Sequence, residues 1–136
     1  METCKKCNNE NCIEYGRRKT KELDINFMFR ARAASIKRDK KSLGIPVMEG
    51  LGPYLIELWN LQKGLCYYSE LEMQLTNYAK NRFFATVDRI IPELGYVRGN
   101  VALCCSIINK MKQDLTLKEL DFWCQTILDK RSVCKT

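Results

Sequence analysis

The stretch of residues 85–109, ATVDRIIPELGYVRGNVALCCSIIN, restricts the fold of this chain more than any other. It opens with a short β-type run, and a second apolar run starts at Val101. A Pro-Glu-Leu-Gly turn and an Arg-Gly-Asn turn lie between the two runs. Apolar runs bounded by turn residues predict strands. From Asn109 the sequence becomes polar and rich in lysine, so we expect the order strand, loop, strand, helix.

This stretch resembles the core of the HNH, or His-Me finger, endonucleases. The resemblance rests on Asp88, Ile90-Ile91-Pro92, Asn100-Val101-Ala102-Leu103, Cys105 and Asn109-Lys110-Met111-Lys112. It covers about residues 54–128, and small phage and giant-virus members often carry a basic helix upstream. It implies an α+β fold, with a small ββα-metal core and an antiparallel hairpin surrounded by additional helices.

The resemblance also implies a site. In an intact HNH site a divalent cation, Mg²⁺ or Mn²⁺, is held on the scissile phosphate. Matched position by position, Asp88 and Asn109 would be the metal ligands and Asn100 would hold the loop together. Oxygen ligands suit Mg²⁺, which also keeps several waters. The implied activity is metal-dependent nicking of DNA, as in homing endonucleases.

The catalytic histidine of that pattern is absent, because its position is Arg89 and the chain contains no histidine. A guanidinium stays protonated and cannot act as a general base. Losing a positioned base typically costs about 10²–10⁴ in rate, whereas an arginine can grip a phosphate with its forked donors. Some HNH-like phage and viral sequences carry the same Asp-Arg-Ile, so whether the chain is an enzyme stays open. The alternative bases are tyrosines for which packing is the more common role: Tyr67, Tyr68 and Tyr96.

Cysteines raise the question of zinc. The two Cys-x-x-Cys pairs of the family are reduced here to Cys66 and Cys105. Two thiolates do not make a closed tetrahedral site, so we expect this pair to lie close together without a metal, and Cys104 to point to the other face of its strand. A separate group near the N-terminus offers three ligands, and both Zn²⁺ and free thiols remain open for it: Cys4, Cys7 and Cys12.

Positive charge is concentrated in one segment. The chain has a net charge of +7, and residues 17–41 hold ten basic and three acidic residues, which accounts for all of it. Such a segment predicts a phosphate-binding surface, with a solvated helix face as the equally weighted alternative. The candidate nucleic-acid contacts, with DNA favoured over RNA, are basic residues of this segment and of the core: Arg30, Arg32, Lys37, Arg38, Lys40, Lys41, Arg98, Lys110 and Lys112.

Three helices are expected outside the core. One spans residues 26–41 with Asn26 as its N-cap, and one spans 54–62 and ends at a glycine. The third spans 117–128, begins with a Thr116/Glu119 capping box, and carries an apolar stripe that predicts burial in the core: Leu117, Leu120, Trp123, Cys124 and Ile127.

The chain is accordingly divided into a cysteine-containing basic segment (1–25), a basic helix and connector (26–52), an HNH-like core with the C-terminal helix (53–130) and a tail (131–136). No apolar run is long enough to span a bilayer and no apolar signal core is present. We therefore expect an intracellular, soluble protein without a membrane partner. Three functions remain: a nuclease, a catalytically inactive DNA-binding protein, or a virion or structural protein with a protein partner in a viral assembly.

Overall fold

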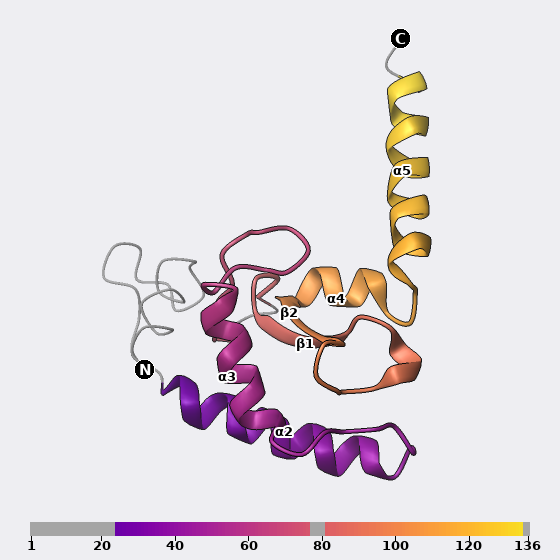
Figure 1. Cartoon of the computed structure of the whole chain (residues 1–136). Coiled ribbons are helices and arrows are strands. Elements are labelled where there is room, and N and C mark those ends of the chain that lie inside the picture. Colours follow the sequence, from indigo (N-terminus) through magenta and orange to yellow (C-terminus); the bar gives the residue numbers. More distant parts are fainter. Residues whose placement is uncertain (1–23, 77–80, 135–136) are drawn as a thin grey trace, which may run out of the picture.

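The computed structural model describes residues 24–76 and 81–134. Along them lie α2 (Ile25–Lys41), α3 (Leu51–Leu61), β1 (Ala85–Arg89), the 3₁₀ turn η1 (Pro92–Leu94), β2 (Val101–Cys105), α4 (Ser106–Lys112) and α5 (Leu117–Cys134) (Figure 1). The described part is therefore a mixed α+β structure of four helices and one two-stranded antiparallel hairpin, as the sequence predicted. None of these helices combines the length and the apolar character needed to cross a bilayer.

The hairpin is the centre of the fold. Ala85 pairs with Cys105 and Arg89 pairs with Val101, and all five residues of β2 are buried. Helix α4 follows β2 without a loop and packs against both strands. It begins at Ser106 and not at Asn109, because the apolar run continues from the strand into the helix and hides the boundary between them.

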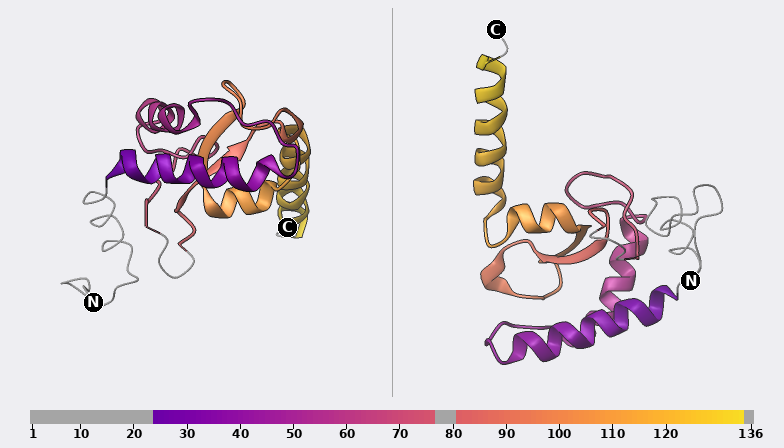
Figure 2. Two further views of the ribbon diagram at one scale, coloured as in Figure 1. Left: turned by 90° about the horizontal axis from the view of Figure 1, so that it is seen from below. Right: turned by 180° about the vertical axis from the view of Figure 1, so that it is seen from behind.

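Helices α2 and α3 pack on each other, and α3 also contacts β2 (Figure 2). The buried residues of the two helices belong to one hydrophobic cluster: Phe29, Ala33, Ile36, Leu51, Tyr54 and Leu55. At Gly52 the helices approach so closely that a Cβ would lie 3.3 Å from the Cγ of Arg30. Helix α3 starts earlier than predicted, because Pro53 falls in its first turn, where a missing N–H costs no hydrogen bond.

The N-cap of α2 is Asp24, whose Oδ1 accepts a hydrogen bond from the Phe27 N–H at 3.2 Å. The prediction of Asn26 for this role was wrong, because Asp24 is an equally good capping residue two positions upstream. Three basic residues in the last turn complement the helix dipole: Arg38, Lys40 and Lys41.

Helix α5 begins with the predicted capping box. The Thr116 N–H donates to Glu119 Oε2 at 2.7 Å, and the Glu119 N–H donates to Thr116 Oγ1 at 3.2 Å. The helix then projects away from the hairpin and from α2 (Figures 1 and 2). The prediction that its apolar stripe is core was wrong, since Trp123 is 53% and Ile127 55% exposed. The chain turns outward after α4 at Gln113, which has a positive φ of 47°.

Candidate functional site

Asp88 lies on β1 and is only 4% exposed. Its carboxylate accepts a hydrogen bond from the Tyr68 hydroxyl. The ammonium of Lys112 lies 3.4 Å from Asp88 Oδ1 and 3.3 Å from Oδ2. The same ammonium donates to the carbonyl oxygen of Arg89 at 2.9 Å. Both carboxylate oxygens are therefore engaged by donors of the protein itself.

Lys112 is the last residue of α4 and its side chain is 0% exposed. A buried ammonium is costly unless charge and hydrogen bonds compensate it, and here a carboxylate and a carbonyl do so. The expectation that Lys112 contacts nucleic acid was therefore wrong. Helical spacing could have indicated this burial. Ile108 and Asn109 precede Lys112 by four and three residues and share its helix face. That face packs on the hairpin.

Tyr68 acts as a hydrogen-bond donor to Asp88. Burial raises its pKa most, and the hydrogen bond to Asp88 and the charge of that carboxylate raise the pKa further. The phenol thus stays protonated across the physiological range. Tyr68 is in consequence no general base in this arrangement, although it lies beside the carboxylate.

Asn109 lies on α4 and its side chain reaches β1. Its Nδ2 donates to Thr86 Oγ1 at 3.0 Å and is 3.4 Å from the carbonyl oxygen of Val87. Helix α4 thus contacts β1 through Asn109 at the two residues before Asp88. In residues 24–76 and 81–134, however, no three His, Cys, Asp or Glu side chains form a group that could hold a metal ion.

Arg89 lies on β1 next to Asp88. Its guanidinium donates to the Pro92 carbonyl oxygen at 3.2 Å and lies 3.6 Å from Asp114 Oδ1. It also lies over the ring of Tyr96, 5.6 Å from the centroid. Adjacent side chains of a strand point to opposite faces, so Arg89 is turned toward the η1 loop while Asp88 is turned toward Lys112.

Asn100 holds the loop between the strands, as the resemblance implied. Its Nδ2 donates to the carbonyl oxygens of Ile91 and Gly95 at 2.9 and 2.8 Å, and its Oδ1 accepts from the Ile91 N–H at 2.9 Å. The side chain is buried. These three bonds satisfy loop backbone groups that a buried turn would otherwise leave unpaired.

Cys66 and Cys105 are neighbours, as predicted. The Cys105 N–H donates to Cys66 Sγ at 3.4 Å. Burial raises the pKa of Cys66, but hydrogen bonds from the Ser69 hydroxyl and from backbone N–H groups outweigh it and lower the pKa overall. Burial raises the pKa of Cys105, and also that of Cys104, to about 12. Cys104 Sγ lies 3.6 Å from Thr86 Oγ1. The possible zinc ligands near the N-terminus lie outside the described residues: Cys4, Cys7 and Cys12.

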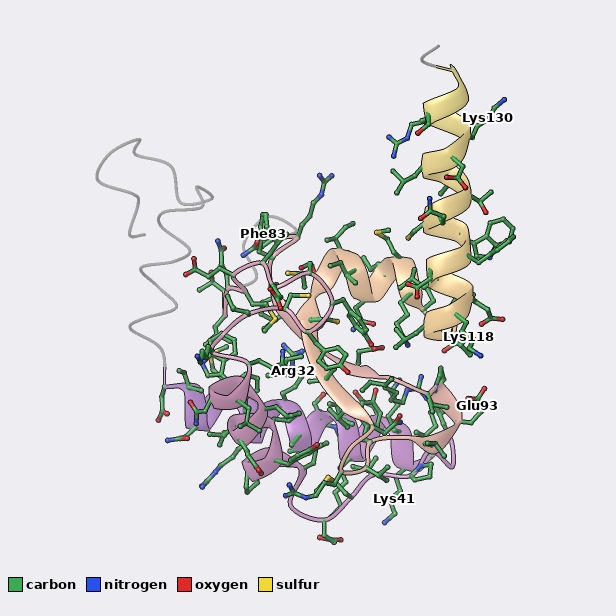
Figure 3. All side chains as sticks on the ribbon, turned by 45° about the horizontal axis from the view of Figure 1, so that its top comes forward. Arg32, Lys41, Phe83, Glu93, Lys118 and Lys130 are labelled. Carbon is green, nitrogen blue, oxygen red and sulfur yellow. The ribbon has the colours of Figure 1, made fainter. Side chains whose placement is uncertain are left out.

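The basic residues of α2 divide into two sets. Arg30, Lys37 and Lys41 are exposed and share one helix face by their spacing of seven and four residues, and Arg38 is exposed beside them. Arg32 instead lies 5.0 Å from the Phe84 ring centroid, and burial lowers its pKa. Lys41 lies at the outer edge of the molecule, whereas Arg32 lies among interior side chains (Figure 3).

The remaining predicted cations do not extend this row. Lys40 is half-buried. Arg98 stacks 4.3 Å from the Tyr54 ring centroid and pairs with Glu57 at 3.3 Å. Lys110 is exposed on α4. The predicted contacts therefore form one row on α2 and scattered single charges elsewhere.

The described residues thus combine a carboxylate neutralised by an internal lysine with a separate basic row on α2. No protein-family model matches this chain, and neither a curated protein nor a solved structure matches it.

Proposed function

We propose that this chain is a DNA-binding protein on an HNH-like ββα scaffold, in which the carboxylate of the former metal site has become part of the core. The hairpin with α4 packed against it supports the scaffold. The observation that carries the binding function is the outward row of cations on α2, formed by Arg30, Lys37 and Lys41 with Arg38 beside them.

The row suits phosphates for two reasons. Helix α2 contains six basic residues and one acidic residue, so its field attracts an anionic polymer. A different face of the helix is buried through Phe29, Ala33 and Ile36, and this packing fixes the orientation of the row. Each cation that neutralises a DNA phosphate releases condensed counterions, and this release drives sequence-independent binding.

Binding is favoured over cutting by the surroundings of Asp88. A divalent cation at this carboxylate would stand beside the Lys112 ammonium, 3.3 Å from Asp88 Oδ2, and like charges at such separations repel strongly in a buried site. Arg89 cannot remove a proton from water. The raised pKa of Tyr68 excludes its phenol from the same task at neutral pH.

The binding proposal is tested by the salt dependence of affinity for a short DNA duplex, measured by fluorescence anisotropy. Replacing Arg30, Lys37 and Lys41 together by Gln should reduce the slope of log K against log salt by about 2.7, since each phosphate contact contributes about 0.9. The matched control replaces three exposed cations on other segments by Gln: Lys63, Arg82 and Lys118. Equal losses in the two triple variants would show that total charge, and not α2, sets the affinity. A duplex RNA of the same sequence tests the preference for DNA.

The absence of cutting is tested by nicking of supercoiled plasmid in Mg²⁺ and in Mn²⁺. We expect no nicking by the wild-type chain. The control variant replaces Asp88 by Leu together with Lys112 by Met, because removing both charges of a buried pair avoids leaving one uncompensated. Nicking by the wild type that is lost in this double variant would overturn the proposal in favour of a nuclease. A chain that neither retards DNA nor nicks it would favour the structural alternative.

A further inference from the structure

Helix α5 carries an apolar stripe that the described structure covers only in part. Leu117, Leu120, Cys124 and Ile127 follow the alternating three- and four-residue spacing of a coiled-coil seam. Trp123 and Leu128 flank this seam. Leu117, Leu120 and Cys124 are half-buried, whereas Trp123, Ile127 and Leu128 are 53%, 55% and 51% exposed. α5 packs on α4 and otherwise stands away from the hairpin and α2 (Figure 1).

An exposed stripe of this kind needs an explanation. Most of the stability of helices in proteins comes from packing of the apolar face. Contiguous exposed apolar surface marks interaction sites in soluble proteins. The charges that border the stripe indicate which kind of partner fits it.

Those charges exclude DNA and favour a second copy of α5. The helix holds three basic and three acidic residues, so it lacks the positive field that α2 provides. Its first half is net acidic through Lys118, Glu119 and Asp121, and its second half is net basic through Asp129, Lys130 and Arg131. A helix with opposite charges on its two halves is complementary to itself when two copies run antiparallel.

We propose that the chain forms a homodimer through antiparallel pairing of two α5 helices along this stripe. The two-fold arrangement places Glu119 and Asp121 of one copy beside Lys130 and Arg131 of the other, and it repeats this contact at the opposite end. Antiparallel packing also aligns each positive helix terminus with a negative one. The helices are about 27 Å long at 1.5 Å per residue, so the pair separates the two basic bodies.

Sedimentation velocity of the full chain over increasing concentration tests the pairing. The mass should rise from 15.9 kDa toward twice that value. Replacing Trp123 and Ile127 together by Ser should keep the chain at the monomer mass. Phe122→Ser is the matched control, because Phe122 is 59% exposed but lies off the stripe, and it should associate like the wild type. A wild type that stays monomeric at all concentrations, or an equal effect of the two changes, would overturn the proposal.

Charge variants test the orientation. The pair Glu119→Lys and Asp121→Lys should weaken self-association, as should the pair Lys130→Glu and Arg131→Glu, because each places like charges together in an antiparallel dimer. An equimolar mixture of the two double variants should associate about as well as the wild type. In a parallel dimer each double variant would instead self-associate as strongly as the wild type, and the mixture of the two would associate more strongly than the wild type. That result would overturn the antiparallel arrangement.

Discussion

Helices α2 and α5 are similar in length, 17 and 18 residues, and both carry an apolar stripe, yet only the stripe of α2 is buried. α2 lies against α3 and contributes Phe29, Ala33 and Ile36 to the core. α5 leaves Trp123 and Ile127 more than half exposed. An apolar stripe on a helix therefore predicts a packing surface, but it does not show whether the stripe is buried within the same chain.

The two helices also differ in charge. α2 has six basic residues against one acidic residue, and α5 has three of each. A helix whose apolar face is already covered can offer its polar face to an anionic polymer. A neutral helix with an uncovered apolar face is suited to a protein partner, because burial of that face is the dominant gain on association.

We expect the largest difference between the two helices in the loss of stability when an aromatic residue of each is replaced by alanine. Phe29 is 4% exposed and its ring centroid lies 5.7 Å from that of Trp59. Phe29→Ala should lower the free energy of unfolding by about 3–5 kcal/mol, because it removes buried contacts and leaves a cavity. Trp123→Ala should change it by less than about 0.5 kcal/mol at concentrations where the chain is monomeric. Urea unfolding measures both, and equal losses would show that α5 is covered within one chain.

A second effect should appear at alkaline pH. The folded state holds the protons of Cys104 and Cys105 to a pKa of about 12, against 9.0 for an ordinary thiol. Their contribution to stability is therefore complete below pH 9.0 and is lost as the pH rises toward about 12. The protonated Tyr68 acts in the same direction.

Variants of β2 test whether the buried thiols of the hairpin cause this loss of stability at alkaline pH. Cys104→Ala should make the fall of the unfolding free energy with pH shallower by at most about 1.4 kcal/mol per pH unit, the limit for one proton. Ala102→Gly, on the same strand, keeps both thiols and should leave the fall unchanged. Urea unfolding at several pH values above 9 measures the slope, and an equal change in both variants would contradict the assignment.

The smallest effect concerns the two N-caps. Asp24→Ala and Thr116→Ala each remove a capping side chain worth about 1 kcal/mol. In α2 the loss should appear in global unfolding, because that helix is part of the core. In α5 it should appear as faster hydrogen exchange in the first turn, with global unfolding unchanged. Asp24→Asn and Thr116→Ser keep the caps and serve as controls; a global loss from Thr116→Ala would mean that α5 unfolds together with the core.

Features with local causes could be predicted from the sequence. The two strands and the capping box of Thr116 and Glu119 depend on short-range spacing and turn residues. The closeness of Cys66 and Cys105 followed from a match to a known pattern and agrees with the contact observed. The strands and the capping box are set by a few neighbouring residues, whereas the closeness of Cys66 and Cys105, 39 residues apart, could be expected only from the resemblance.

Lys112 shows where this kind of prediction fails. A lysine in a polar, lysine-rich stretch predicts a solvent-exposed side chain, and its neighbour Lys110 is exposed. The burial of Lys112 depends on the packing of α4 against the hairpin, which brings Asp88 and the Arg89 carbonyl within reach of its ammonium. Composition does not contain that information, because two lysines two residues apart lie on different faces of a helix.

The sequence by itself determined the order of the elements, the basic character of α2 and the apolar stripe of α5, because these depend on residue type and period along one segment. Tertiary structure alone decided which stripe is covered, which cations reach solvent and which cation neutralises Asp88. The physical reason is that burial is a property of two surfaces. A side chain 24 residues away in sequence supplies the partner of Asp88, and a helix without such a surface nearby keeps its apolar face exposed.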